Sequence, residues 1–180
     1  MRFVFPVFTT LFLFAVAREG GPADRVEPKT VPSVDLKKYA GTWYEIARYP
    51  NRFQRKCNSD VRATYSLQPN GKVRVLNQCK EANGKIKTAK GTAKVVDQVS
   101  NAKLKVTFFW TFYGDYWILD LDQDYTYAVV GEPKRKYLWV LSRTPEIDSN
   151  LYATILERIK EQGYDTMKLI PTKSGKKNNE

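Results

Sequence analysis

Apolar and polar residues alternate with a period of two over most of the middle of the chain. In residues 60–68 Ala63 and Tyr65 share one face, and in residues 102–109 Val106 and Phe108 do the same. Since successive side chains of a strand point to opposite faces of a sheet, this alternation predicts half-buried β-strands. The predicted strands cover residues 42–48, 60–68, 72–79, 86–96, 102–109, 115–121, 125–131 and 137–142.

Turn sequences separate these segments. Asn70-Gly71 is a strong hairpin signal, and Gly84, Asn101, Gly114 and Pro133 mark further turns. Before the first strand, Leu36 and Tyr39 predict a short helical turn. Eight short strands in sequence order indicate an all-β fold, either an antiparallel up-and-down barrel or a sandwich.

Helical periodicity is convincing only in residues 149–162. Asp148 or Ser149 can cap this helix and Gly163 can end it. The predicted strands 115–121 and 125–131 are apolar on both faces, so we expect the helix to cover their outer face. A last short strand is expected around residues 167–170. The apolar stripe of the helix consists of Tyr152, Ile155, Leu156 and Ile159.

The two ends of the chain differ in composition from its middle. Residues 1–17 combine Arg2, an apolar run and the small-residue site Ala15-Val16-Ala17, a pattern typical of a secretory signal peptide. The run is shorter than the roughly 20 residues of a spanning helix, and no lipid-anchor cysteine follows it. We therefore predict an exported protein, periplasmic and possibly outer-membrane associated if bacterial, otherwise secreted. Residues 18–33 are expected to form a flexible arm, 34–172 the folded domain, and 173–180 a basic disordered tail.

The chain is strongly basic, with 30 Lys and Arg residues against 19 Asp and Glu residues and a formal net charge of +11. Many lysines alternate with apolar residues in the predicted strands, which indicates the solvent face of a sheet. An exported protein seldom meets nucleic acid, so we expect no nucleic-acid partner. Anionic membrane lipids are the more available partner for such a surface.

Two cysteines, Cys57 and Cys79, flank the predicted hairpin around Asn70-Gly71. In an exported chain a disulfide is the default. Strict pairing about this turn would place position 84 opposite Cys57, so a bridge requires Cys57 to lie in an irregular segment. We predict the disulfide; the alternative is a pair of free thiols, one of them reactive.

Three short motifs then follow one another along the chain: GTW at 41–43, DYTYA at 124–128 and LSRTP at 141–145. Their order and spacing resemble the signature of the lipocalin family, in particular the group of bacterial lipocalins, plant temperature-induced lipocalins and apolipoprotein D. The resemblance implies an eight-stranded antiparallel up-and-down β-barrel with one C-terminal α-helix packed on the outside. It also implies that Trp43 sits at the closed base with Arg143 across its ring. The predicted structural signature residues are Gly41, Trp43, Asp124, Tyr125 and Arg143.

The same motifs orient the predicted strands. If Arg143 points inward, period two turns Trp139 and Tyr137 inward, and the same logic from Trp43 turns Glu45 and Ala47 inward. The resulting lining is mainly aromatic and aliphatic, which suits a fatty acid, a lysophospholipid or a similar lipid; alternatively, the side chains fill the barrel. The predicted ligand-binding residues are Glu45, Ala63, Tyr65, Val75, Asn77, Val106, Phe108, Tyr116, Ile118, Val130, Tyr137 and Trp139.

The chain contains no histidine, which removes histidine-based triads, histidine-ligated haem and most zinc sites. The series Asp120, Asp122, Asp124 lacks the glycine and terminal glutamate of a calcium loop, so we predict a hairpin turn, and we expect neither metal nor cofactor. Glu45 is interpreted as a hydrogen-bonded buried carboxyl group rather than a catalytic acid.

We therefore expect an exported carrier of a hydrophobic ligand, monomeric or weakly dimeric, possibly acting in membrane maintenance or stress response. One alternative is a lipocalin-fold enzyme that acts on an oxidised lipid through a free pocket cysteine. A second alternative is a basic interaction protein whose barrel is filled.

Overall fold

The structure is a computed structural model that describes residues 26–109 and 112–175. The predicted signal peptide 1–17 lies outside the described residues. Of the predicted arm, residues 26–33 run beside the barrel, where Val31 donates its backbone N–H to the carbonyl of Ile118 at 3.0 Å. Of the predicted tail, residues 173–175 are described.

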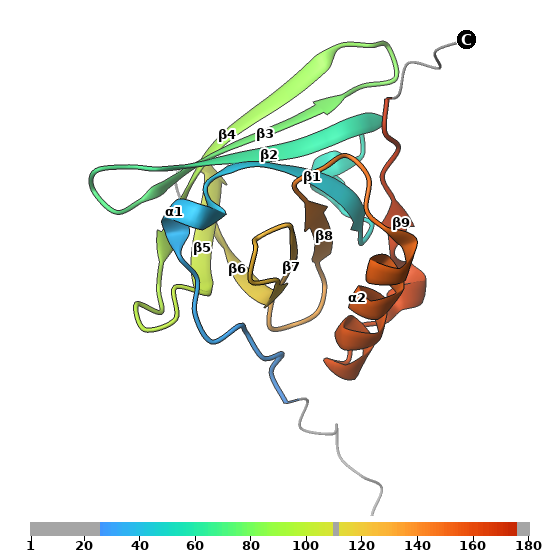
Figure 1. Ribbon diagram of the computed structural model, residues 1–180. Coiled ribbons are helices and arrows are strands. Elements are labelled where there is room, and N and C mark those ends of the chain that lie inside the picture. The colour runs from blue at the N-terminus through green and yellow to red at the C-terminus, as the bar shows by residue number, and fades with distance from the viewer. Residues whose placement is uncertain (1–25, 110–111, 176–180) are drawn as a thin grey trace, which may run out of the picture.

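The described residues form one antiparallel sheet that closes on itself (Figure 1). Each strand pairs with the next, β8 returns to β1, and β1 pairs with β2. The predicted barrel fold is therefore confirmed. The strands are β1 (Gly41–Arg48), β2 (Ser59–Leu67), β3 (Val73–Lys80), β4 (Ile86–Val95), β5 (Lys103–Phe109), β6 (Phe112–Leu121), β7 (Tyr127–Gly131) and β8 (Leu138–Ser142).

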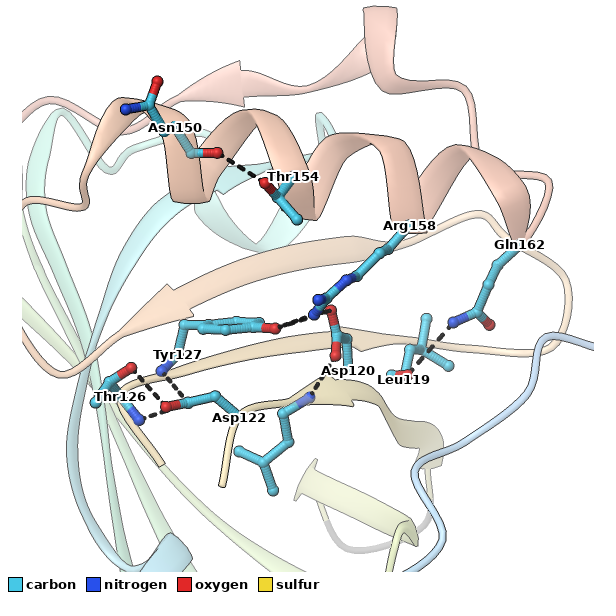
Figure 2. A network of polar contacts seen from close by, with 10 residues as sticks. Leu119, Asp120, Asp122, Thr126, Tyr127, Asn150, Thr154, Arg158 and Gln162 are labelled. Carbon is cyan, nitrogen blue, oxygen red and sulfur yellow. Dashed lines mark hydrogen bonds and ion pairs between the residues drawn. The ribbon is translucent and has the colours of Figure 1, made fainter. Parts of the chain in front are cut away.

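The largest differences from the predicted bounds lie in β6 and β7. Gly114 suggested a turn, but it lies inside β6 opposite Val106, so this strand begins three residues earlier than predicted. β7 begins at Tyr127 because the preceding turn is fixed by Asp122, whose carboxylate accepts the N–H groups of Thr126 and Tyr127 (Figure 2). The aspartate series thus includes a hairpin turn, as predicted.

A short C-terminal strand, β9 (Ile170–Pro171), pairs with the end of β1. It follows the 3-10 helix η2 (Thr166–Lys168), so the strand predicted at 167–170 is shorter and later than expected. β1 and β2 pair only as far as Tyr44 and Arg62, and the C-terminal segment bridges them beyond that point. Asp60 of β2 donates its N–H to the carbonyl of Lys173 at 3.0 Å.

A register shift between Glu45 and Ala47 in β1 changes which way the strand faces. Glu45 lies opposite Leu141, whose side chain belongs to the inner core, whereas Ala47 packs in the outer core beneath the helix. The prediction that Ala47 points into the barrel is therefore wrong. A β-bulge adds one residue to one strand and so reverses the alternation beyond it.

The helix α2 (Ser149–Glu161) covers the outside of the barrel, as predicted (Figure 1). Asp148 caps it, and Ile155 and Ile159 are buried in a second core between helix and sheet. At its edge Arg158 donates to the hydroxyl of Tyr127 at 2.6 Å (Figure 2). Among the described helices, none has the length and apolar character needed to cross a membrane.

The short helix α1 (Leu36–Tyr39) precedes β1 and lies at one end of the barrel, which we call the base. Because neighbouring strands are antiparallel, the connections β1–β2, β3–β4, β5–β6 and β7–β8 all lie at the opposite end. We call this end the mouth.

Candidate functional site: the barrel interior

The base is closed by Trp43, whose side chain is completely buried. Its indole N–H donates to the carbonyl oxygen of Tyr39 at 2.8 Å, and the two rings lie 5.0 Å apart. The Arg143 guanidinium lies over the indole, 3.8 Å from the ring centroid. Such a cation–π contact contributes about 0.5–2 kcal/mol, depending on how far the pair is desolvated.

The same guanidinium ties together backbone segments that are distant in sequence. It donates to Lys38 at 2.6 Å, to Thr42 at 3.1 Å and to Tyr125 at 3.2 Å, in each case at the carbonyl oxygen. α1, β1 and the β6–β7 turn are thereby fixed to one side chain. Arginine suits this position because its donors form a rigid planar fork.

Gly41 allows this arrangement. Its φ of +100° is a conformation that residues with a Cβ rarely adopt, and a Cβ there would lie 3.1 Å from Nη1 of Arg143. Of the other signature residues, Tyr125 accepts the N–H of Asp35 on its hydroxyl at 2.8 Å and so fixes the start of α1. The side chain of Asp124 is exposed.

Above the base, three tyrosines fill the barrel. The hydroxyl of Tyr116 lies 2.7 Å from that of Tyr39 and 2.9 Å from that of Tyr65. Burial raises the pKa of Tyr65 to about 12 and those of the other two well above the usual value, so all three are neutral near pH 7. The cavity beside them measures only about 20 Å³. That volume holds one water molecule and excludes an acyl chain.

Other inner-face positions are apolar and only partly shielded from solvent. Val106 and Trp139 pack against the inner core but remain half-buried. The Phe108 ring lies over Gly91 of the neighbouring strand β4, so closely that a Cβ there would be 2.8 Å from it. Asn77 lies opposite Ala63 on the same face, and its Oδ1 is buried with no hydrogen-bond partner among the described residues.

Glu45 is the most buried carboxyl group facing the interior, with 6% exposure. Its carboxylate accepts a hydrogen bond from the Gln54 amide and another from the Thr172 hydroxyl, each at 2.5 Å, and Nε of Arg48 lies 3.5 Å away. Burial raises the pKa of this carboxyl above 4.5, and the hydrogen bonds from Thr172 and Gln54 partly offset the shift.

The β1–β2 connection folds over the mouth and contains the 3-10 helix η1 (Arg52–Gln54). Besides contacting Glu45, Gln54 accepts the indole N–H of Trp139 at 3.0 Å. The Phe53 ring lies 5.6 Å from that of Tyr137, which in turn stacks on Trp139 at 5.8 Å. The mouth connection is therefore joined to the inner wall by polar and aromatic contacts.

A disulfide holds the other end of this connection. Cys57 and Cys79 are bonded with an S–S distance of 2.00 Å, which confirms the predicted bridge and leaves neither thiol free. Cys57 lies before β2, in the irregular segment that the prediction required, and the β2–β3 register shifts between Ser59 and Arg62.

The structure brings the predicted lining residues together on one face. Ala63, Asn77 and Glu45 are placed there by their cross-strand partners, and Tyr137 lies at the mouth just before β8. Gln54 and Thr172 were missed because they come from a loop and the C-terminal segment, where no alternation signals the facing. The others belong to the inner core or pack against it: Tyr65, Val75, Val106, Phe108, Tyr116, Ile118, Val130 and Trp139.

A second cleft of about 250 Å³ lies where β1 and β2 diverge, and it shares Glu45 with the barrel interior. Glu45, Asp60 and Arg62 line it together with Thr172 and residues 173–175 of the C-terminal segment. Its charged lining does not suit an apolar ligand, so the barrel interior remains the candidate site.

Comparison with known proteins agrees with this architecture. A family model described as a lipocalin-like domain matches residues 34–174. Temperature-induced lipocalin-1 of Arabidopsis thaliana is 42% identical over 157 residues, which cover 83% of this chain and 84% of the relative. Outer membrane lipoprotein Blc of Vibrio cholerae is 38% identical over 172 residues, covering 94% and 97%. The structure of insecticyanin from the tobacco hornworm Manduca sexta matches 82% of this chain and 85% of its own, with a TM-score of 0.68 and 22% identity, a likeness of fold alone.

The fold and its interior define a small up-and-down β-barrel, the class whose interior is filled by side chains or holds one small ligand. The chain belongs to the lipocalin family. Members of that family bind small hydrophobic ligands.

Arg143→Ala should lower the free energy of unfolding by about 2–4 kcal/mol, because it removes the cation–π contact and leaves backbone carbonyls at the base without their donor. Arg143→Lys should recover only part of the loss. Urea denaturation measures both, with Arg74→Ala on the exposed outer face of β3 as the control. A loss no larger than that of the control would show that the base is stable without this side chain.

Glu45→Gln should change how stability depends on pH. Because the folded protein holds the Glu45 proton more tightly than the unfolded chain, the free energy of unfolding falls as pH rises from about 4.5 through the higher folded pKa. The glutamine variant cannot ionise, so it should lack this fall and exceed the wild type in stability at pH 7.

Urea midpoints between pH 4 and pH 8 test this expectation, with exposed Glu157→Gln on α2 as the control. A Glu45→Gln variant that is less stable at pH 7 and keeps the wild-type pH profile would contradict it.

Proposed function

We propose that this protein is an exported carrier that holds one hydrophobic ligand, a fatty acid, lysophospholipid or similar lipid, in the mouth half of its barrel. The observation that supports this most directly is the contrast within the interior. The base is filled by the Trp43 and tyrosine side chains, whereas Val106, Phe108 and Trp139 offer apolar surface that solvent partly reaches. Apolar surface left partly hydrated inside a barrel is what an apolar ligand can bury.

The filled base limits how such a ligand binds. With about 20 Å³ beside Tyr39, Tyr65 and Tyr116, an acyl chain ends above this group unless the rings move. Each methylene that is buried contributes about 0.8 kcal/mol, so even a partly inserted chain can bind appreciably. We therefore propose that the chain enters tail first and that its polar group stays near the mouth.

Polar side chains near the proposed position of the acyl chain favour some lipid classes over others. An ionised fatty-acid carboxylate is repelled by an ionised Glu45, whereas a lipid hydroxyl can donate to the unpaired Oδ1 of Asn77. Lysophosphatidylcholine has a glycerol hydroxyl and no net charge, because its choline ammonium group balances its phosphate, so it meets both conditions better than a fatty-acid anion does. We rank it ahead of a free fatty acid.

The N-terminal sequence pattern and the relatives support a proposal for the cellular setting. The N-terminal pattern favours export, and the Vibrio cholerae relative is named an outer membrane lipoprotein. For this chain we propose export, contact of its basic surface with anionic membranes, and a role in membrane maintenance or stress response. We keep the proposal that it is a monomer or a weak homodimer.

The alternative of an enzyme acting through a pocket cysteine loses its main support. Both cysteines of the chain are in the disulfide, so neither offers a thiolate. We therefore propose a binding role without catalysis.

Native mass spectrometry of the purified protein, followed by organic extraction, should reveal a bound lipid of the host that produced it. We expect a species with one acyl chain, because an eight-stranded barrel of this size holds at most one small ligand. Titration of delipidated protein with lysophosphatidylcholine and with palmitate then ranks the two head groups. Protein that is empty and binds neither would contradict the carrier proposal.

Trp139→Arg should lower affinity for lysophosphatidylcholine at least tenfold, because it places a charge on the apolar inner wall. Leu76→Arg adds the same charge on the outer face of β3, opposite Lys90, and should leave the affinity unchanged. Isothermal titration measures both, and circular dichroism checks that each variant is folded. Equal affinities in two folded variants would show that the ligand does not occupy the barrel.

A further inference from the structure

Exposed aromatic side chains gather at the mouth. In the described part of the chain, Phe53, Phe109, Phe112 and Tyr113 are the aromatic residues with large exposure, at 53%, 75%, 80% and 48%. Phe53 lies in η1, and the other three lie where β5 ends and β6 begins. Ile86, at the start of β4, adds 51% exposure at the same end.

Among the described residues, the Tyr137 ring lies beside Phe53 and the Lys94 ammonium lies over Tyr113, yet these side chains stay about half exposed or more. Phe109 and Phe112 are cross-strand partners at the end of the β5–β6 ladder, so their rings are presented together by a hairpin. Clustered exposed apolar residues mark interaction surfaces far more often than scattered single ones do. The surface defined by Phe53, Ile86, Phe109, Phe112 and Tyr113 is called the aromatic rim below.

The charge of the hairpin loops differs between the two ends of the barrel. At the base, the hairpin loops are residues 68–72, 96–102 and 122–126. They contain one basic residue, Lys72, and three acidic residues, Asp97, Asp122 and Asp124. At the mouth, the acidic residues are Glu81 and Glu132, and Glu132 is buried, where it accepts N–H groups of its own loop. The basic residues of the mouth loops 49–58, 81–85 and 132–137 are Arg52, Arg55, Lys56, Lys85, Lys134, Arg135 and Lys136.

We propose that the mouth is a docking face for an anionic lipid bilayer, with the rings of Phe109 and Phe112 inserted at the level of the headgroups. Phenylalanine is among the side chains that surface-bound proteins bury at the boundary between headgroups and acyl chains, and nearby lysine and arginine residues are attracted to anionic headgroups. An acidic protein partner could match the charge, but it gives no reason for Phe109 and Phe112 to project from the end of a hairpin. A bilayer accounts for both features.

Docking in this way gives the barrel a defined orientation. α1 and the acidic loops of the base point away from the membrane, and the interior faces the bilayer surface. This inference deepens the membrane contact of the proposed function, but it does not require that a lipid occupies the barrel, so it can be tested separately from the carrier role.

Co-sedimentation with vesicles tests the inference. Wild-type protein should bind vesicles of phosphatidylcholine with 30% phosphatidylglycerol and not vesicles of phosphatidylcholine alone, and 0.5 M salt should weaken binding because it screens the charges. Phe109→Ser combined with Phe112→Ser should reduce binding at least tenfold. Val96→Ser combined with Val99→Ser is the matched control, since these side chains are 48% and 94% exposed at the base end.

A charge variant separates the two contributions. Lys134→Glu combined with Lys136→Glu should reduce binding to the anionic vesicles, whereas Lys72→Glu at the base should not. Urea denaturation confirms that each variant is folded.

If wild-type protein does not bind anionic vesicles, the docking proposal is wrong, and a protein partner becomes the better explanation of the aromatic rim. Equal binding by the phenylalanine variant and its control would overturn the assigned face. Lysophosphatidylcholine titration of the same variants distinguishes the two proposals: loss of vesicle binding with unchanged lipid affinity supports docking through the rim. Vesicle binding without any binding of lysophosphatidylcholine would contradict the carrier proposal and leave the docking proposal intact.

Discussion

The position of Arg143 over Trp43 is the contact on which the rest of the barrel depends. The indole closes the base and the guanidinium covers it, while the remaining donors hold carbonyl groups of α1, β1 and the β6–β7 turn. The carbonyls of Thr42 and Tyr125 are partly buried, so without this donor they would be left poorly paired. Because one end is closed by this contact, the other end can remain open without loss of the fold.

Closure at the base also divides the interior into two parts with different chemistry. Beside α1, the hydroxyl groups of Tyr39, Tyr65 and Tyr116 satisfy one another and leave almost no space. Toward the mouth the lining is apolar, and the buried polar groups are held from outside the barrel wall. Glu45 is the clearest case, since its two hydrogen-bond donors come from the mouth connection and the C-terminal segment. Any ligand that reaches it must compete with Gln54.

Most inner-face residues could be predicted from sequence, because alternation with a period of two determines the facing of a regular strand. The outer helix could be predicted from its own helical periodicity. Alternation gives the wrong facing for Ala47, because a bulge after Glu45 reverses it and no residue type in this segment signals a bulge. It also missed Gln54 and Thr172, because a loop and a tail have no periodicity and their positions depend on tertiary contacts. The disulfide was predictable from composition, but its geometry required an irregular segment that only the structure locates.

The aromatic rim and the interior are joined by the end of β5. Phe108 packs against the inner core, whereas the adjacent Phe109 is exposed at the mouth. A short apolar path therefore runs from inside the barrel to its outer surface. For a lipid, the costly step in moving between a bilayer and a carrier is exposure of its chain to water. A mouth whose apolar lining continues onto its rim shortens that exposure, and the basic loops around it supply the attraction that holds such a surface against anionic headgroups.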